Sequence, residues 1–261
     1  MKKNKLLLFS SIIAFSACHK TDYLDVNAGD RPPLSANIRF VNARIAPAGI
    51  QFWTFTQKVT TEAVAPGAAS PYVPTTFGNV QINFTEGSGT AYKASRQFGN
   101  SASYTATGGP NGPIAGYHHT VFAAPAKNDA AKDTLLLFYD NLSAPADGKA
   151  ALRFVHLASG IASVSVKLQQ QGTETTLYNT VAYGSAGGSN LQGSAYDSAP
   201  FTTVNAGTIS LIVRAGEGTD PLQIQQQGLT GINLEAGKIY TVFIRKDAKG
   251  LINARIITHQ Q

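Results

Sequence analysis

The sequence has little cysteine, little charge and no long apolar run after its N-terminus, and each shortage excludes a class of protein. Cys18 is the only cysteine among 261 residues, so no intramolecular disulfide can form. Charged residues make up 14% of the chain, below the ~25% usual for globular proteins. The hydrophobic share of 43% nevertheless argues against disorder. No later segment has the ~20 apolar residues of a membrane-spanning helix. Because no disulfide can form, the cores are expected to hold by packing alone.

Basic residues are neither abundant nor clustered. The formal net charge is +6, but Lys2, Lys3 and Lys5 lie in a segment with the features of an export signal, and without them the charge is +3. The longest basic run further along the chain is Arg245-Lys246. Nucleic-acid binding requires a clustered basic face that releases counterions. We therefore expect no nucleic-acid partner.

Residues 1–17 combine the features of a secretory signal peptide. Three lysines precede an apolar run at 6–15, which is too short to span a bilayer in the mature chain. Two small residues then come directly before Cys18. This order resembles a bacterial lipoprotein signal, which implies that Cys18 is lipidated and becomes the first residue of the mature protein. An ordinary cleaved signal peptide with an unmodified cysteine is the alternative.

A lipid on Cys18 would make the membrane a partner of the mature chain without any transmembrane helix. Acyl chains contribute ~0.8 kcal/mol per buried CH₂ group, so several chains anchor a protein stably. His19 follows the cysteine in place of the Asp that retains many bacterial lipoproteins in the inner membrane, so we expect a location at the outer membrane. Residues 18–35 contain two prolines and no helical period, which is typical of an extended tether.

A repeated strand organises the remainder of the chain. The segment 37–43 (NIRFVNA) returns 114 positions later as 151–157 (ALRFVHL). Period-two alternation and frequent Gly and Pro turn signals predict antiparallel β-sandwiches. We expect two of them in tandem, at 36–142 and 150–261, with a linker at 143–149. Further strands are predicted near 80–85, 91–98, 101–106, 117–122, 134–139, 163–169, 207–214 and 252–258.

The second module carries a family resemblance in four segments. They are 152–158 (LRFVHLA), the alternating strand at 164–166, 205–211 (NAGTISL) and 234–242 (LEAGKIYTV). Together they resemble the domain of unknown function family 4397, which is found in bacterial exported proteins and lipoproteins. The resemblance implies immunoglobulin-like sandwiches and an exported location, and it implies no catalytic residues. It covers the second module well and the first more loosely.

Histidine gives the first candidate for chemistry. Adjacent residues on a strand point to opposite faces, so His118 and His119 cannot chelate one metal ion from a regular strand. We expect a structural role for both. His156 occupies the position that Asn42 holds in the first copy. An asparagine cannot act as a general base, so this position does not carry a catalytic base that both modules need.

Catalytic motifs are absent from the sequence. No Gly-x-Ser-x-Gly elbow, phosphate-binding loop, His-Glu-x-x-His pattern or calcium loop occurs. Asp129, Asp133 and Asp140 are the closest group of acids, and their spacing does not fit a loop of oxygen ligands. We predict no catalytic residue, no metal site and no cofactor.

Two aromatic residues depart from their counterparts in the second module. Aligning the copies without gaps places Trp53 opposite Lys167 and Phe55 opposite Gln169. Both aromatic side chains are therefore predicted to face outward on a sheet. Such a pair is a candidate surface for stacking on a sugar ring or for binding a partner. Packing under the loops of the first module, or against the second module, is the alternative.

Two short segments resemble the three-residue O-glycosylation motif of some lipoprotein-rich bacteria. They are Asp133-Thr134-Leu135 and Asp197-Ser198-Ala199, which makes Thr134 and Ser198 candidate acceptors. Thr134 also fits the start of a strand.

The combined observations favour a non-enzymatic protein of the cell envelope that acts as a binding, adhesion or structural module. The main alternative is a carbohydrate-binding accessory protein that uses exposed aromatic residues. A hydrolase built on loop carboxylates is a third, more distant alternative. The expected partners are the membrane, through the lipid on Cys18, and a glycan or an envelope protein.

Overall fold

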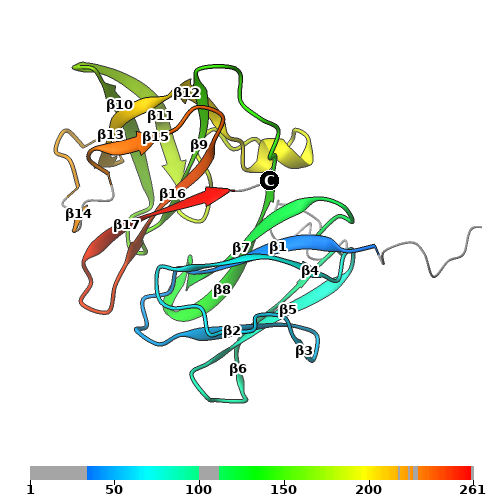
Figure 1. The fold of residues 1–261 in the computed structure, drawn as a ribbon. Helices are drawn as coiled ribbons and strands as arrows, with labels where there is room; N and C mark the ends of the chain where they lie inside the picture. The colour runs from blue at the N-terminus through cyan, green and yellow to red at the C-terminus, as the bar shows by residue number, and fades with distance from the viewer. Residues whose placement is uncertain (1–33, 100–111, 217, 223, 226–228, 260–261) are drawn as a thin grey trace, which may run out of the picture. The chain divides into compact units, whose positions relative to one another are not determined.

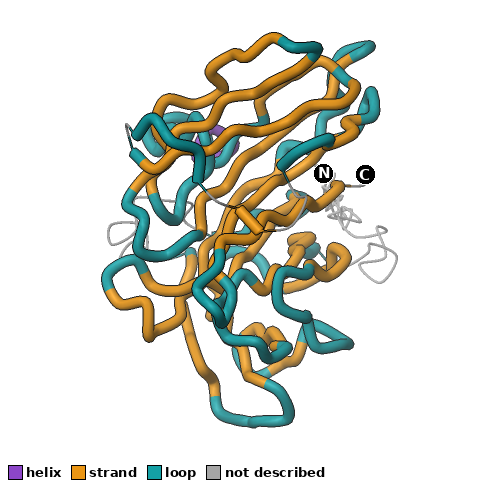
Figure 2. The backbone as a smooth tube through the Cα atoms, turned by 90° about the vertical axis from the view of Figure 1, so that its left-hand side faces the viewer, coloured by secondary structure: helices purple, strands orange, loops and turns teal. Residues whose placement is uncertain are grey.

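The computed structural model describes residues 34–99, 112–216, 218–222, 224–225 and 229–259. Within these ranges the backbone consists of strands and connecting turns, with a short 3₁₀ helix, η2, at Ala195–Ser198 (Figure 2). No helix in these ranges is long and apolar enough to cross a membrane. The predicted signal peptide, Cys18 and the predicted strand at 101–106 lie outside the described residues.

The first sandwich consists of two four-stranded sheets among the described residues (Figure 1). The first sheet has the order β4-β1-β7-β8, formed by Ala69–Thr75, Ala36–Asn42, His118–Ala126 and Asp129–Asp140. The second sheet has the order β3-β2-β5-β6, formed by Gln57–Lys58, Ile50–Thr54, Val80–Glu86 and Tyr92–Phe98.

The second sandwich repeats this plan with a five-stranded and a four-stranded sheet. The larger sheet has the order β12-β9-β16-β17-β14, formed by Thr202–Asn205, Lys149–Leu157, Ile239–Lys246, Ile252–His259 and Ile224–Gln225. The smaller sheet has the order β11-β10-β13-β15, formed by Thr173–Ala182, Ser163–Gln170, Gly207–Ala215 and Ile232–Leu234. The prediction of two tandem β-sandwiches is confirmed.

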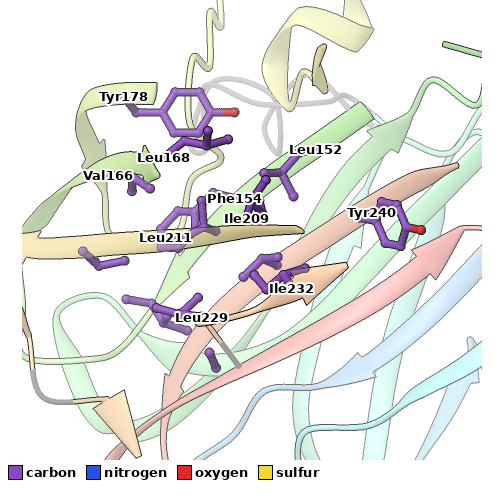
Figure 3. Close-up of a cluster of buried hydrophobic side chains, with 14 of the residues drawn as sticks. Leu152, Phe154, Val166, Leu168, Tyr178, Ile209, Leu211, Leu229, Ile232 and Tyr240 are labelled. Carbon is purple, nitrogen blue, oxygen red and sulfur yellow. The ribbon is translucent and has the colours of Figure 1, made fainter. Parts of the chain in front are cut away.

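Side-chain alternation explains how each sheet covers its core. Along β10, Val164 and Val166 are buried while Lys167 faces away from the core. The first core lies between its two sheets and includes Phe40, Phe52 and Phe84. The second core is built in the same way from residues that include Leu152, Phe154, Val166, Leu211 and Tyr240 (Figure 3). Each large apolar side chain that is fully buried stabilises the fold by about 1.5–3 kcal/mol.

The opening strand of each sandwich pairs in parallel with a later strand. β1 runs parallel to β7, with Arg39 beside Thr120, and β9 runs parallel to β16, with Arg153 beside Thr241. β14 and β17 form a further parallel pair. Antiparallel pairing predominates elsewhere, as the sequence predicts. The parallel pairs arise because the chain crosses to the other sheet before it returns beside the opening strand. The period of the side chains does not show whether two strands pair in parallel or antiparallel, so the sequence pattern did not predict these pairs.

The opening strands are buried on both faces, because the two sandwiches pack against each other. Residues 34–261 form one compact unit. Phe122 of β7 and Phe243 of β16 meet edge to face, with ring centroids 5.4 Å apart. The apolar cluster shared by the two sandwiches consists of Val41, Ala43, Phe122, Ala124, Phe138, Val155, Leu157, Ala186, Ala199, Phe243 and Ile257.

Candidate functional site

The outer surface of sheet β3-β2-β5-β6 carries the outward aromatic residues. Phe52, Ile82 and Phe84 of this sheet are fully buried in the first core, so the alternate residues of β2 and β5 lie on the opposite surface. We call this surface the aromatic–amide face. It comprises Gln51, Trp53, Lys58, Gln81, Asn83, Thr85, Tyr92, Ser95 and Gln97, together with Phe55 in the turn after β2, whose carbonyl is bonded to Asn83 and Tyr92.

Trp53 lies at the centre of the aromatic–amide face. It is paired with Lys58 on one side and with Asn83 on the other. Its indole Nε1 donates a hydrogen bond of 3.3 Å to Thr85 Oγ1. Its ring meets the edge of Tyr92 at a centroid distance of 6.2 Å. Trp53 thus faces outward and packs on its own sheet, and its described contacts do not include the second sandwich.

Phe55 is held in a backbone conformation that is rare for a bulky residue. It follows β2 in a two-residue turn and has φ 51°, in the left-handed region that favours glycine. Its N–H donates to Gln81 O at 2.8 Å. Its carbonyl accepts from Asn83 Nδ2 at 2.8 Å and from Tyr92 Oη at 3.0 Å. These three bonds fix the turn, and the Phe55 side chain remains 44% exposed.

The polar side chains of the aromatic–amide face are bonded to one another. Asn83 is fully buried, and its Oδ1 accepts from Gln81 Nε2 at 3.0 Å and from Ser95 Oγ. Gln81 Nε2 also donates to Ser95 Oγ at 2.6 Å. A buried amide that is satisfied in this way has a defined orientation, so the face is rigid around Trp53.

The equivalent surface of the second sandwich lacks these features. Lys167 occupies the position equivalent to Trp53 and forms an exposed ion pair with Glu174. The outward residues of β10 and β13 include no aromatic side chain and are Ser163, Ser165, Lys167, Gln169, Thr208, Ser210, Ile212 and Arg214. The aromatic character is therefore specific to the first sandwich.

A closed ring of polar contacts joins the two sandwiches on the other side of the fold. Asp140 Oδ1 forms an ion pair of 2.7 Å with Arg153 Nη2, in which the N–H is not aligned with the oxygen. Arg153 Nε donates to Thr241 Oγ1 at 3.1 Å, and Thr241 Oγ1 lies 2.8 Å from His259 Nε2. His259 Nδ1 lies 2.6 Å from Tyr72 Oη, which donates to Asp140 Oδ2 at 2.8 Å. We call these five residues the interface ring.

The interface ring has one proton arrangement that satisfies every contact. Tyr72 gives its only proton to Asp140, so His259 donates from Nδ1 to the Tyr72 oxygen. His259 Nε2 is then an acceptor for the Thr241 hydroxyl, which itself accepts from Arg153. This arrangement requires a neutral His259 and an ionised Asp140. Burial lowers the pKa of His259 to about 3. Burial alone would raise the pKa of Asp140, but the positive charge of Arg153 and the hydrogen bonds donated by Thr120 and Tyr72 lower it overall.

The predicted structural roles of His118 and His119 fit their surroundings. His119 is fully buried, and its Nε2 accepts from the Ile114 N–H at 3.2 Å. Its ring packs on Tyr139 at a centroid distance of 4.8 Å. His118 points to the other side of the strand, where its ring meets Tyr72 at 4.9 Å. The described residues contain no group of three or more His, Cys, Asp or Glu side chains that could hold a metal ion.

His156 and Asn42 perform the same structural task in the two sandwiches. Both are fully buried. Asn42 Nδ2 donates to Ala48 O at 3.1 Å, and His156 Nε2 lies 2.9 Å from Ile161 O. Each side chain thereby fixes the loop that follows the opening strand.

Two acidic residues converge on Arg44, whose charge pairs with both: Asp133 Oδ2 lies 2.8 Å from Arg44 Nε, and Glu86 Oε2 lies 2.6 Å from Arg44 Nη2. Asp129 pairs with Lys132, and Asp140 pairs with Arg153. A mainly apolar cavity of about 600 Å³ lies between β8 and the 182–198 segment, and its described lining contains no carboxylate. Three further cavities contain Glu235 as their only described acidic residue.

The two candidate O-glycosylation residues, Thr134 and Ser198, both line the mainly apolar cavity beside β8. Thr134 is half-buried within β8. Ser198 is buried, and its hydroxyl donates to Ala195 O at 2.7 Å. Modification of Ser198 in the folded chain would require this hydroxyl to be released.

Tyr92, Gln81, Asn83 and four members of the interface ring were not among the residues that the sequence singled out, and the fifth member, Asp140, was noted only for its spacing from other acids. For the amides, the available signal was their alternation with apolar residues along β5. For Arg153, the signal was an arginine repeated at the same place in two otherwise apolar opening strands. Neither signal specifies a partner, because the partners come from strands that are distant in sequence.

Comparison with known proteins identifies a family. A family model described as Domain of unknown function (DUF4397) matches residues 36–167. This range contains the strands of the first sandwich, the linker and the beginning of the second sandwich, and it is slightly more than half of the chain. The resemblance inferred from the sequence is confirmed, with the match centred on the first sandwich and not on the second.

Other comparisons add little. No curated protein matches the chain at a significant level. Among solved structures, a streptococcal virulence factor that binds alpha-glucan has 8% identity and a TM-score of 0.25, over 84% of this chain and 97% of that one. A protein of Bacteroides uniformis described as a candidate for cell adhesion has 12% identity and a TM-score of 0.25, over 88% and 99% of the two chains. Similarity at this TM-score supports no conclusion about function.

Acid is expected to destabilise the folded chain between about pH 6.5 and pH 4. Burial lowers the pKa of His119 and of His156 to about 4 and that of His259 to about 3, whereas an unfolded histidine titrates near ~6.5. The unfolded chain therefore binds more protons in this window. Stability is complete above about pH 6.5 and is lost as the pH falls toward the folded-state values.

Each of these buried histidines contributes up to about 1.4 kcal/mol per pH unit to that loss. Urea unfolding at about pH 7.5, 6 and 5 measures the slope. His119→Gln removes one of the three histidines that bind a proton on unfolding. It should therefore reduce the slope of unfolding free energy against pH by about a third. An unfolding free energy that does not change over this range would contradict the neutral, buried state of the histidines.

Proposed function

We propose that this chain, which belongs to the DUF4397 family, is a non-enzymatic binding, adhesion or structural module of the bacterial cell envelope. The aromatic–amide face is the observation that carries the proposal. Phe55, two residues after the half-buried Trp53, is 44% exposed, and Tyr92, whose ring meets that of Trp53, is 42% exposed. Rings that served only stability would be expected in a core, whereas a rigid exposed aromatic cluster is typical of interaction sites.

The interface between the sandwiches supports a role in presenting this face. The second sandwich packs against sheet β4-β1-β7-β8 through the shared apolar cluster and the interface ring. Sheet β3-β2-β5-β6 lies on the opposite side of the first core. Packing between the modules therefore leaves the aromatic–amide face open for a partner (Figure 1).

We further propose that the chain is a lipoprotein of the outer membrane, anchored through acylated Cys18. The signal-like N-terminus and the position of the only cysteine support this proposal. Two or more acyl chains give stable membrane attachment. The two sandwiches would then work at the membrane surface.

A carbohydrate-binding accessory role is the second candidate. The aromatic rings of Trp53, Phe55 and Tyr92 favour it, since flat rings combine apolar area with a specific stacking geometry. The hydrolase alternative gains no such support, because the described cavity linings bring no two carboxylates together.

Removal of Cys18 is expected to abolish lipidation. Cells that express the chain are grown with labelled palmitate, and the purified protein is assayed for label. The parent chain should incorporate the label and remain with the membrane fraction, while Cys18→Ala should carry none. Lys5→Ala, which leaves the cysteine in place, serves as the control. Label retained in Cys18→Ala would sink the lipoprotein proposal.

Truncation of Trp53 is expected to remove binding without unfolding the protein. Adsorption of the full chain to isolated bacterial envelopes should fall at least about five-fold in Trp53→Ala, because the central ring of the face is lost. The melting temperature should drop by only about 2–4 °C, since the ring is half-exposed. Lys167→Ala, at the equivalent position of the second sandwich, is the matched control. Equal adsorption by both variants would refute a role for the face.

A further inference from the structure

We infer that the aromatic–amide face binds a neutral glycan chain, whose pyranose rings stack on Trp53, Tyr92 and Phe55. The inference rests on the proposed binding function and names its ligand class. Three properties of the face lead to it: its charge, the arrangement of its amides, and the conformation that holds Phe55.

The charge of the face selects against ionic ligands. Lys58 is the only charged member of the ten residues that make up the face. An acidic polymer or a phosphorylated ligand would be expected to meet several Arg or Lys side chains. Apart from the three aromatic residues, the others carry amide or hydroxyl groups. Neutral donors and acceptors beside aromatic rings match the surface of a sugar, which alternates hydroxyl edges with apolar ring faces.

The amides are already oriented before any ligand arrives. Gln81 Nε2 is occupied by Asn83 and Ser95, which fixes the plane of the Gln81 amide. Among the described contacts none uses Gln81 Oε1, so this carbonyl is available to accept a hydrogen bond from a sugar hydroxyl. A pre-oriented acceptor beside a rigid ring reduces the entropy lost on binding.

The turn at Phe55 gives a third indication. A hairpin turn with positive φ also follows β10 in the second sandwich, at Gln171 with φ 50°. A residue with positive φ thus begins the turn in both sandwiches, whereas an exposed aromatic side chain at that position occurs only in the first. Glycine would adopt this conformation without strain. The presence of an exposed Phe55 at a strained position is explained if its ring contacts a ligand.

The single tryptophan makes a direct test possible. Trp53 is the only tryptophan in the chain, so the emission of the full-length protein reports on this face alone. The protein is titrated with cellohexaose, maltohexaose and chitohexaose to about 10 mM, in a detergent without a sugar head group. We expect a saturable blue shift with at least one of these oligosaccharides. No change in emission with any of the three would overturn the inference.

A matched pair of tyrosine variants distinguishes the loss of stacking on this face from the effect of removing any exposed tyrosine. Tyr92 and Tyr117 are 42% and 39% exposed, and Tyr117 lies next to β7 on the other sheet. Tyr92→Ala should weaken binding roughly ten-fold, while Tyr117→Ala should change it less than about two-fold. Tyr92→Phe should keep most of the affinity, because it retains the ring. Equal losses in Tyr92→Ala and Tyr117→Ala would contradict the inference.

Periodate oxidation of the envelopes distinguishes this inference from the broader proposal, because it destroys the vicinal diols of sugars. If treatment abolishes adsorption of the parent chain, a glycan ligand is supported. If adsorption survives treatment but is lost in Trp53→Ala, the ligand is not a glycan, and only this inference fails. If Trp53→Ala adsorbs as well as the parent, the proposed function fails too.

Discussion

The structure depends on the ion pair between Arg153 and Asp140, which is completely buried between the two sandwiches. Burying two charges costs more than their attraction returns unless further contacts satisfy them. Here Tyr72, His259 and Thr241 complete the interface ring. Loss of one partner from such a pair typically costs about 3–5 kcal/mol of stability. The pair therefore favours the arrangement of the two sandwiches in which Arg153 and Asp140 meet over any arrangement that separates them. The surrounding apolar cluster supplies the larger share of the burial.

This arrangement determines which surfaces remain for function. One sheet of each sandwich is covered on both faces, and the other sheet keeps a free outer surface. The two free surfaces differ in chemistry, with Trp53 and Tyr92 on the first and the Lys167–Glu174 pair on the second. Tandem copies of one module thus differ in the chemistry of the surface that each leaves free, and in the proposed function the first sandwich carries the binding surface.

The sequence predicted the strands whose alternation is regular, such as β5, β10 and β13, but not those with an irregular pattern. β4 contains Pro71 and Pro74, which argue against a strand in general and are tolerated because β4 is an edge strand. The alternation that predicted an outward Trp53 could not reveal Tyr92, whose place beside it depends on the register of β6 and on a bulge. Arg153 lies on the face of β9 opposite its core, and it is buried because the first sandwich covers that face.

The cooperativity of the two sandwiches tests this account most directly. Urea unfolding is followed by Trp53 emission, which reports on the first sandwich, and by far-UV circular dichroism, which reports on the strands of both. The buried interface predicts a single transition with coincident midpoints, within about 0.2 M urea of each other. A tryptophan transition clearly separated from the whole-chain transition would show that the sandwiches unfold independently, and would contradict the central place of the Arg153–Asp140 interface.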